Sequence, residues 1–387
     1  LSFRQSPFNE VDGAILAKLS YLPLERVLEQ GSMEPISIAD AAKKLFALPN
    51  INGSFMRKED SPLLSALAES PRFCNMGLFA CMNRFDPESQ TQFFAMTIRL
   101  SESELYVAFR GTDNTLVGWK EDFNMCFVCP VPAQKLAVEY LESTVKNSVG
   151  RITVGGHSKG GNLAVYAAAF ASPAAQLRVQ KVYNYDGPGF DDKVLSTEGY
   201  KNICERVSTI VPQSSIVGML LGHEEKYTIV HSGQSGIMQH DLCSWNVRQS
   251  AFKSLETVDN NSRFIDKTLK SWLSEMDYAE REKFVDGVYA VMCETHTNSI
   301  REMNSRKLAN LRTVIKSTQK MDDETREAVL KALRLLLKST KASLVEMIEN
   351  REEKTAPFIK SSPFLTKGAA FWLCTSVRAH FSAPLCK

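Results

Sequence analysis

The chain has 387 residues, of which 44% are hydrophobic and 23% are charged, and its formal net charge is +2. These values are ordinary for a soluble globular protein and give no reason to expect nucleic acid as a partner. No apolar run is long enough for a transmembrane helix, and the first residues lack the pattern of a secretory signal. Nine cysteines, an odd number, favour reduced thiols over a disulfide framework, so we expect a cytoplasmic protein.

Helical patterns open the chain. Residues 12–19 and 37–46 each carry an apolar stripe behind an N-cap residue. The period then changes to that of strands at 76–82, 91–100 and 105–109, which are separated by short polar turns. Closely spaced strands of this kind predict an antiparallel meander.

Strands and helices alternate farther along the chain. We expect helices at 115–124, 133–145 and 162–170, and strands at 151–155, 181–185, 207–211 and 227–231. Such alternation predicts βαβ units on a mostly parallel sheet. From Leu242 onward we expect helices, above all an amphipathic one at 321–338. The predicted organisation is an N-terminal helical segment (1–70), an α/β core (71–255) and a helical, charged C-terminal extension (256–387).

Residues 156–160 read Gly-His-Ser-Lys-Gly, the G-x-S-x-G pattern of a nucleophile elbow. A strand before Ser158 and a helix after it supply the context that this pattern needs. The glycines suit a sharp turn in which the backbones on both sides of the serine approach closely. A P-loop fits poorly, because the lysine follows the serine here. Ser158 is therefore the predicted nucleophile; the alternative is a glycine-rich turn with an idle serine.

A serine nucleophile needs a base, and the base needs an orienting acid. Asp186 ends the next predicted strand, where it either orients an imidazole or caps its own Gly-Pro-Gly loop. Among six histidines, His240 follows a flexible loop after the last predicted strand, and we favour it as base over His231. His157 is expected to point away from the serine, and His223 to be a solvated surface residue.

An oxyanion hole needs two donors near the nucleophile. One is the backbone N–H of Lys159, the residue after the serine. The other is expected from Thr112, in a polar loop after the predicted strand at 105–109. We expect the Lys159 side chain on the helix surface; the alternative is a cation that favours an anionic substrate. This set of residues needs no metal and no organic cofactor.

Residues 107–112 (Val-Ala-Phe-Arg-Gly-Thr), with Trp119 and Asp122 downstream, and 156–164 (Gly-His-Ser-Lys-Gly-Gly-Asn-Leu-Ala) resemble the class 3 lipase branch of the α/β-hydrolases. The likeness is closer to an uncharacterised bacterial family related to those lipases, through residues 185–190 and 211–220. It covers roughly residues 8–250. The resemblance implies an α/β-hydrolase fold and a Ser–Asp–His hydrolase, with Ser158 as nucleophile and Thr112 in the oxyanion loop.

One departure concerns the acid. Class 3 lipases place an aspartate after the strand that corresponds to 207–211, where this chain has Pro-Gln-Ser-Ser. Pancreatic-type lipases place it one strand earlier, in a context similar to that of Asp186. We therefore predict a lipase- or esterase-like enzyme that cleaves a carboxylic ester through an acyl-enzyme on Ser158.

Three alternatives stay open: a thioesterase, an acyltransferase, and a catalytically degraded hydrolase-fold protein that binds or regulates. The expected partner is a small-molecule or lipid ester. The helices expected at 322–350 fit either a cap over the active site or a surface for a protein partner.

Overall fold

The computed structural model describes residues 3, 5–113, 115–125, 127–256, 267–268, 271–272, 275–293, 322–332, 334–335 and 338–339. Every described residue belongs to the first compact unit of the chain, which lies within Leu1–Ser343. None of the helices in this described part combines the length and apolar character that crossing a membrane requires.

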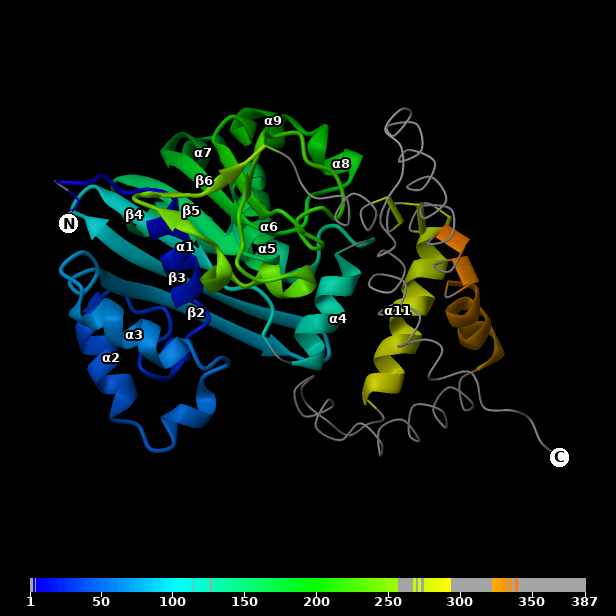
Figure 1. The fold of residues 1–387 in the computed structure, drawn as a ribbon, viewed down its shortest axis with the longest axis horizontal. Helices are drawn as coiled ribbons and strands as arrows, with labels where there is room; N and C mark the ends of the chain where they lie inside the picture. Colours follow the sequence, from blue (N-terminus) through cyan, green and yellow to red (C-terminus); the bar gives the residue numbers. More distant parts are fainter. Residues whose placement is uncertain are drawn as a thin grey trace, which may run out of the picture. The chain divides into compact units, whose positions relative to one another are not determined.

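A nine-stranded sheet forms the centre of the first unit, in the order β1-β2-β3-β4-β5-β6-β7-β8-β11. Figure 1 labels its strands β2 to β6. Strands β4 to β8 run parallel, whereas β1 to β4 pair antiparallel and β11 adds antiparallel to β8. The bounds are β1 Ile36–Ser37, β2 Gly77–Asp86, β3 Thr91–Ser101, β4 Glu104–Phe109, β5 Arg151–His157, β6 Val179–Tyr185, β7 Val207–Pro212, β8 Tyr227–Val230 and β11 Ser254–Leu255. The predicted antiparallel meander and parallel core are confirmed.

Helices cover both faces of this sheet. Their bounds are α1 Glu10–Leu19, α2 Ile38–Phe46, α3 Asp60–Glu69, α4 Leu116–Asn124, α5 Pro132–Asn147, α6 Lys159–Phe170, α7 Pro173–Arg178, α8 Asp192–Leu195, α9 Glu198–Cys204 and α11 Tyr278–Cys293, with short 3-10 turns η1 Leu24–Arg26, η2 Ile51–Ser54, η3 Gly236–His240 and η4 Leu242–Ser244. Residues of α5, α6, α7 and α9 share one hydrophobic core with the sheet, and those of α1, α2 and α3 share another. The sheet is thus buried on both faces, as a parallel sheet requires.

Helix α6 lies at the centre of one core. Every residue from Lys159 to Ala169 is buried, because α6 packs against α5 and α9 as well as the sheet. An alanine-rich sequence suits this position, since small side chains let the helix approach its neighbours closely. Helix α1, on the other face, begins with a capping box in which Asn9 and Asp12 bond each other's backbone N–H groups.

Two predictions for the later part of the chain are wrong. After the single 3-10 turn η4, the chain beyond Leu242 forms short strands, β9 Val247–Arg248, β10 Ala251–Phe252 and β11, instead of the expected helices. His223 is also not a solvated residue: its side chain is 9% exposed, and its Nδ1 lies 2.9 Å from Oε1 of Glu225. Burial pushes the pKa of Glu225 up, but its hydrogen bonds and the charge of His223 outweigh burial and lower that pKa to about 2.

The described residues of the predicted C-terminal extension are largely helical. They include α11, and the described residues from 323 to 339 are helical as well. Lys283 and Glu280 of α11 pair with Glu324 and Lys331 of the second stretch. Residues just before α11 contact this second stretch too, through a hydrogen bond from the Trp272 indole N–H to the Ala332 carbonyl and an ion pair of Lys338 with Glu275, both 2.8 Å long. The boundaries proposed at 70 and 255 stay predictions, and residues 340–350 of the predicted cap lie outside the described part.

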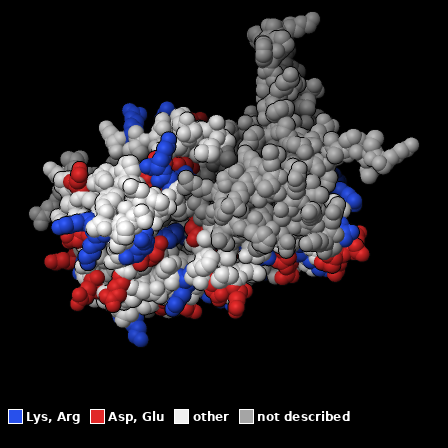
Figure 2. Space-filling view, turned by 90° about the horizontal axis from the view of Figure 1, so that it is seen from below, with Lys and Arg blue, Asp and Glu red and all other residues white. Residues whose placement is uncertain are grey.

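On the face of the molecule drawn in Figure 2, acidic and basic side chains are interspersed over the described surface. This mixture agrees with the formal net charge of +2 for the whole chain. A mixed surface of this kind produces no strong field of one sign on that face.

Candidate active site

Ser158 occupies a sharp turn between β5 and α6. Its φ of 58° and ψ of −131° lie in a region that residues with a side chain rarely adopt. A Cβ added at Gly156 would collide with the backbone oxygen of Gly160, and one added at Gly160 would collide with the carbonyl of Phe109. The strand, turn and helix predicted around Ser158 are therefore confirmed, together with the need for glycine at both positions. The catalytic role of Ser158 stays a prediction.

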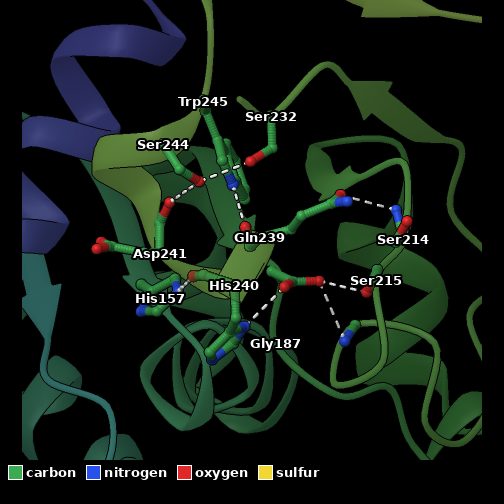
Figure 3. A network of polar contacts seen from close by, with 12 residues as sticks. His157, Gly187, Ser214, Ser215, Ser232, Gln239, His240, Asp241, Ser244 and Trp245 are labelled. Carbon is green, nitrogen blue, oxygen red and sulfur yellow. Dashed lines mark hydrogen bonds and ion pairs between the residues drawn. The ribbon is translucent and has the colours of Figure 1, made fainter. Parts of the chain in front are cut away.

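Asp186 lies at the end of β6 and is 1% exposed. Its Oδ2 is 2.6 Å from Nδ1 of His240, while its Oδ1 accepts hydrogen bonds from the Ser215 hydroxyl (2.5 Å) and the Gly218 N–H (3.2 Å) (Figure 3). The Asx-type contact in the following loop belongs to a neighbour, because the Gly187 N–H donates to Oδ1 of Asn184 at 2.9 Å. Asp186 is thus directed at the imidazole rather than at its own loop.

The loop after β7 is where class 3 lipases carry their aspartate. In this protein the loop has a different role. Ser215 donates to the Asp186 carboxylate, and the neighbouring Ser214 N–H donates to Oε1 of Gln239 at 3.0 Å. The Gln239 carbonyl accepts from the Trp245 indole at 2.8 Å (Figure 3). The loop therefore holds the acid and also the residue next to His240.

The two histidines considered for the base lie in different surroundings. His240 ends η3, its side chain is 20% exposed, and it lines the same cavity as Ser158. His231 follows β8, where its N–H donates to the Lys253 carbonyl at 2.8 Å, and it is not among the residues that line this cavity. The structure brings His240 and Asp186 together, and it does not bring His231 to them.

His157 makes contacts that the sequence alone does not predict. Its Nε2 lies 2.7 Å from the His240 carbonyl, and its Nδ1 lies 2.9 Å from the Tyr21 hydroxyl. Because a carbonyl only accepts, Nε2 carries the hydrogen, and Nδ1 of the neutral ring is an acceptor. The single hydroxyl hydrogen of Tyr21 is shared between this Nδ1 and the His157 carbonyl, which lies 3.1 Å away. Burial, helped by the nearby His240, lowers the pKa of His157 well below its ordinary value, so this ring stays neutral.

The two predicted oxyanion donors both line the cavity beside Ser158. Lys159 is the first residue of α6, so its backbone N–H has no partner inside the helix. The Thr112 hydroxyl donates to Oδ2 of Asp122, which leaves its backbone N–H for the predicted role. Burial raises the pKa of Asp122 to about 6, although the charge of Lys159 and the Thr112 hydrogen bond oppose the rise.

The prediction for the Lys159 side chain is wrong. It is 1% exposed and points into the protein, where its Nζ lies 2.9 Å from Oε2 of Glu121, itself fully buried. The ammonium also donates to the carbonyl and the side-chain oxygen of Gln92, at 2.8 and 2.7 Å. The Lys159 side chain therefore does not lie on the helix surface, and its charge is paired inside the protein and not available to an anionic substrate.

A cavity of about 570 Å³ opens at Ser158 and His240. Apolar side chains form much of its wall, among them Met125, Phe127, Leu220, Trp272, Phe284 and Val285. The last three come from the predicted C-terminal extension, so α11 and the residue Trp272 before it form one side of the cavity. Helix α11 contacts α4 through Asp286, which pairs with Lys120. Within the described residues, no cluster of His, Cys, Asp and Glu is suited to a metal ion.

The sheet order, the covering helices and the turn between β5 and α6 define an α/β-hydrolase fold of the lipase-like kind. The chain belongs to the Mbeg1-like family, a lipase-like family whose model matches residues 67–290. The bacterial origin inferred from the resemblance stays a prediction.

Two lipases of known structure are similar to this chain at low identity. One is a fungal lipase in complex with an inhibitor, at 13% identity and a TM-score of 0.35, over 57% of this chain and 78% of that one. The other is M37 lipase, at 14% identity and a TM-score of 0.33, over 55% and 70%. A search of curated proteins gave no match.

Proposed function

We propose that this protein is a serine hydrolase that cleaves a carboxylic ester through an acyl-enzyme on Ser158. The observation that carries the proposal is the 2.6 Å contact between His240 and the buried Asp186, at the cavity that Ser158 also lines. A serine on a strained turn, a histidine in the same cavity and a carboxylate on that histidine's far nitrogen are the three parts of a nucleophile–base–acid set.

The proposed reaction gives each part a defined role. The Ser158 hydroxyl oxygen attacks the ester carbonyl while Nε2 of His240 takes the hydroxyl proton. Asp186 accepts a hydrogen bond from the Nδ1–H of His240 and stabilises the imidazolium that forms. The N–H groups of Thr112 and Lys159 donate to the oxyanion. His240 then gives its proton to the departing alcohol, and water, activated by the same histidine, releases the acid from Ser158.

The side chains that line the cavity indicate which class of substrate it binds. Its largely apolar wall suits an apolar acyl or alcohol group, which gains free energy by leaving water. A thioester, or acyl transfer to an acceptor other than water, would use the same residues in the same order. The odd cysteine count keeps a reducing, cytoplasmic compartment as part of the proposal.

The rival function is a degraded hydrolase fold that only binds or regulates. It rests on the missing class 3 aspartate and on the long charged C-terminal extension. Asp186 offers a carboxylate from one strand earlier, already in contact with His240. That contact favours the enzyme.

Turnover of simple esters with short, medium and long acyl chains tests the proposal. Ser158→Ala should lower kcat by about 10³-fold or more with an unchanged melting temperature, because the nucleophile is lost. Ser235→Ala, which changes an exposed serine in the loop before η3, is the matched control and should keep full activity. Full activity in Ser158→Ala would remove the assignment.

A further inference from the structure

A buried ion pair lies immediately next to the proposed nucleophile. Lys159 follows Ser158 in the chain, and its ammonium pairs with Glu121 of α4 at 2.9 Å, with the two side chains 1% and 0% exposed. The mechanism proposed above uses only the backbone N–H of Lys159, so the charged side chain has no part in it. Burying two charges gives little net stability compared with apolar packing of the same size. Stability alone therefore gives little reason to bury this pair.

The hydrogen bonds of this pair form a closed network. The ammonium has three N–H donors and three acceptors: Glu121, the Gln92 carbonyl and the Gln92 side chain. Glu121 also accepts from the Gln92 N–H at 3.1 Å and from the Ala133 N–H at 2.9 Å. Because the bonds are directional and mutually dependent, they specify one relative position of α6, α4 and β3.

The same helix α4 holds the second proposed oxyanion donor. Asp122, the neighbour of Glu121, accepts the hydroxyl hydrogen bond of Thr112. The loop that carries Thr112 also runs straight into α4, whose N-cap is Thr115. Two consecutive carboxylates of α4 therefore hold the two residues from which the oxyanion donors come: Glu121 holds Lys159, and Asp122 holds Thr112.

We propose, on the basis of the hydrolase function above, that the Lys159–Glu121 pair is a positioning device for the oxyanion hole. It fixes α4 to the start of α6, so that the N–H groups of Thr112 and Lys159 keep their places relative to Ser158. Oxyanion donors act mainly in the transition state, so a small displacement lowers kcat more than it alters KM.

The test neutralises the pair while keeping its shape, in the variant Lys159→Met/Glu121→Gln. We expect this variant to melt cooperatively, to keep KM within about threefold and to lose about 10- to 100-fold in kcat, less than the loss of a whole donor. An alkylboronic acid, which forms a tetrahedral anion on the serine, should bind more weakly by the same factor.

A second buried pair provides the control. Arg72 and Asp12 are 12% and 5% exposed and lie outside the cavity wall. Arg72→Met/Asp12→Asn should lower the melting temperature while kcat stays within about twofold, because it removes a comparable pair from a place without contact to the donors. A loss of kcat in the control as large as in the test variant would show that lost stability alone explains the effect.

The remaining outcomes distinguish a failure of the positioning role of the Lys159–Glu121 pair from a failure of the proposed hydrolase function. An active wild type with undiminished kcat in Lys159→Met/Glu121→Gln overturns the positioning role alone. A wild type that is inactive toward every ester and unlabelled at Ser158 overturns the proposed function as well. If the double variant does not fold, Glu121→Asp, which keeps the charge but shortens its reach by one methylene, should lose about tenfold in kcat, and an unchanged kcat there overturns the inference.

Discussion

Asp122 makes a pH-dependent contribution to stability whose sign follows from its surroundings. Burial raises its pKa from 3.8 to about 6 in the folded protein, so the folded chain holds a proton there more tightly than the unfolded chain does. The tighter proton binding by Asp122 stabilises the folded state fully below pH 3.8. This stabilisation is lost as the pH rises through about 6. At pH 7 the carboxylate is charged, and its Oδ1 is buried without a hydrogen-bond partner. The ionised side chain therefore costs stability at neutral pH.

Replacing the carboxylate by a neutral amide removes that cost. A rise of about two pKa units corresponds to about 3 kcal/mol, an upper limit because the residue is only half-buried. We expect Asp122→Asn to raise the free energy of unfolding by up to about 3 kcal/mol at pH 7 and to change it little at pH 4. The amide oxygen still accepts the Thr112 hydroxyl, so the fold around the loop is kept.

Urea unfolding at intervals from pH 4 to pH 8 measures the effect. Asp192→Asn, at an exposed carboxylate in α8, is the control and should show no comparable gain at neutral pH. The reasoning is refuted if Asp122→Asn is less stable than the wild type at pH 7, or if the difference between the two is the same at pH 4 and pH 7.

Three further predictions concern the site and its supports. Asp186→Asn should lower kcat by about 10³- to 10⁴-fold in an ester assay, because the imidazolium loses its counter-charge; an unchanged rate places the acid elsewhere. His240→Ala should lower kcat by about 10³-fold or more, while His231→Ala stays within about twofold of the wild type; the reverse order would exchange their roles. Lys18→Met breaks a 2.8 Å ion pair with the fully buried Asp60 and should cost about 3–5 kcal/mol in urea unfolding, which a loss below 1 kcal/mol would disprove.

The parts of the fold that sequence predicts well are those fixed by local patterns. The β-branched run of β5, the alanine-rich α6 and the glycines between them each carry their own signal, so the turn at Ser158 is found without tertiary information. The strands β9 to β11 are two residues long, too short for any period, and they form only because partners are present.

The order of Ser158, Asp186 and His240 along the chain predicts that the last two lie close together, since each follows a strand of the parallel sheet. The burial of individual polar side chains is harder to predict from the sequence. Lys159 pairs with a residue 38 positions away and donates to another 67 positions away, and no local pattern announces either one. His157 likewise meets Tyr21 and the His240 carbonyl at separations of 136 and 83 residues. The sequence alone predicts a surface position for Lys159 and no contact for His157, and the packed structure shows the partners of both.

Labelling with a fluorophosphonate tests the central claim, that Ser158 is an activated nucleophile, most directly. Folded wild-type protein should acquire a single adduct, mapped by mass spectrometry to the peptide that contains Ser158, and Ser158→Ala should acquire none. Folded wild-type protein that takes up no probe, or an adduct that persists in Ser158→Ala, would contradict the account.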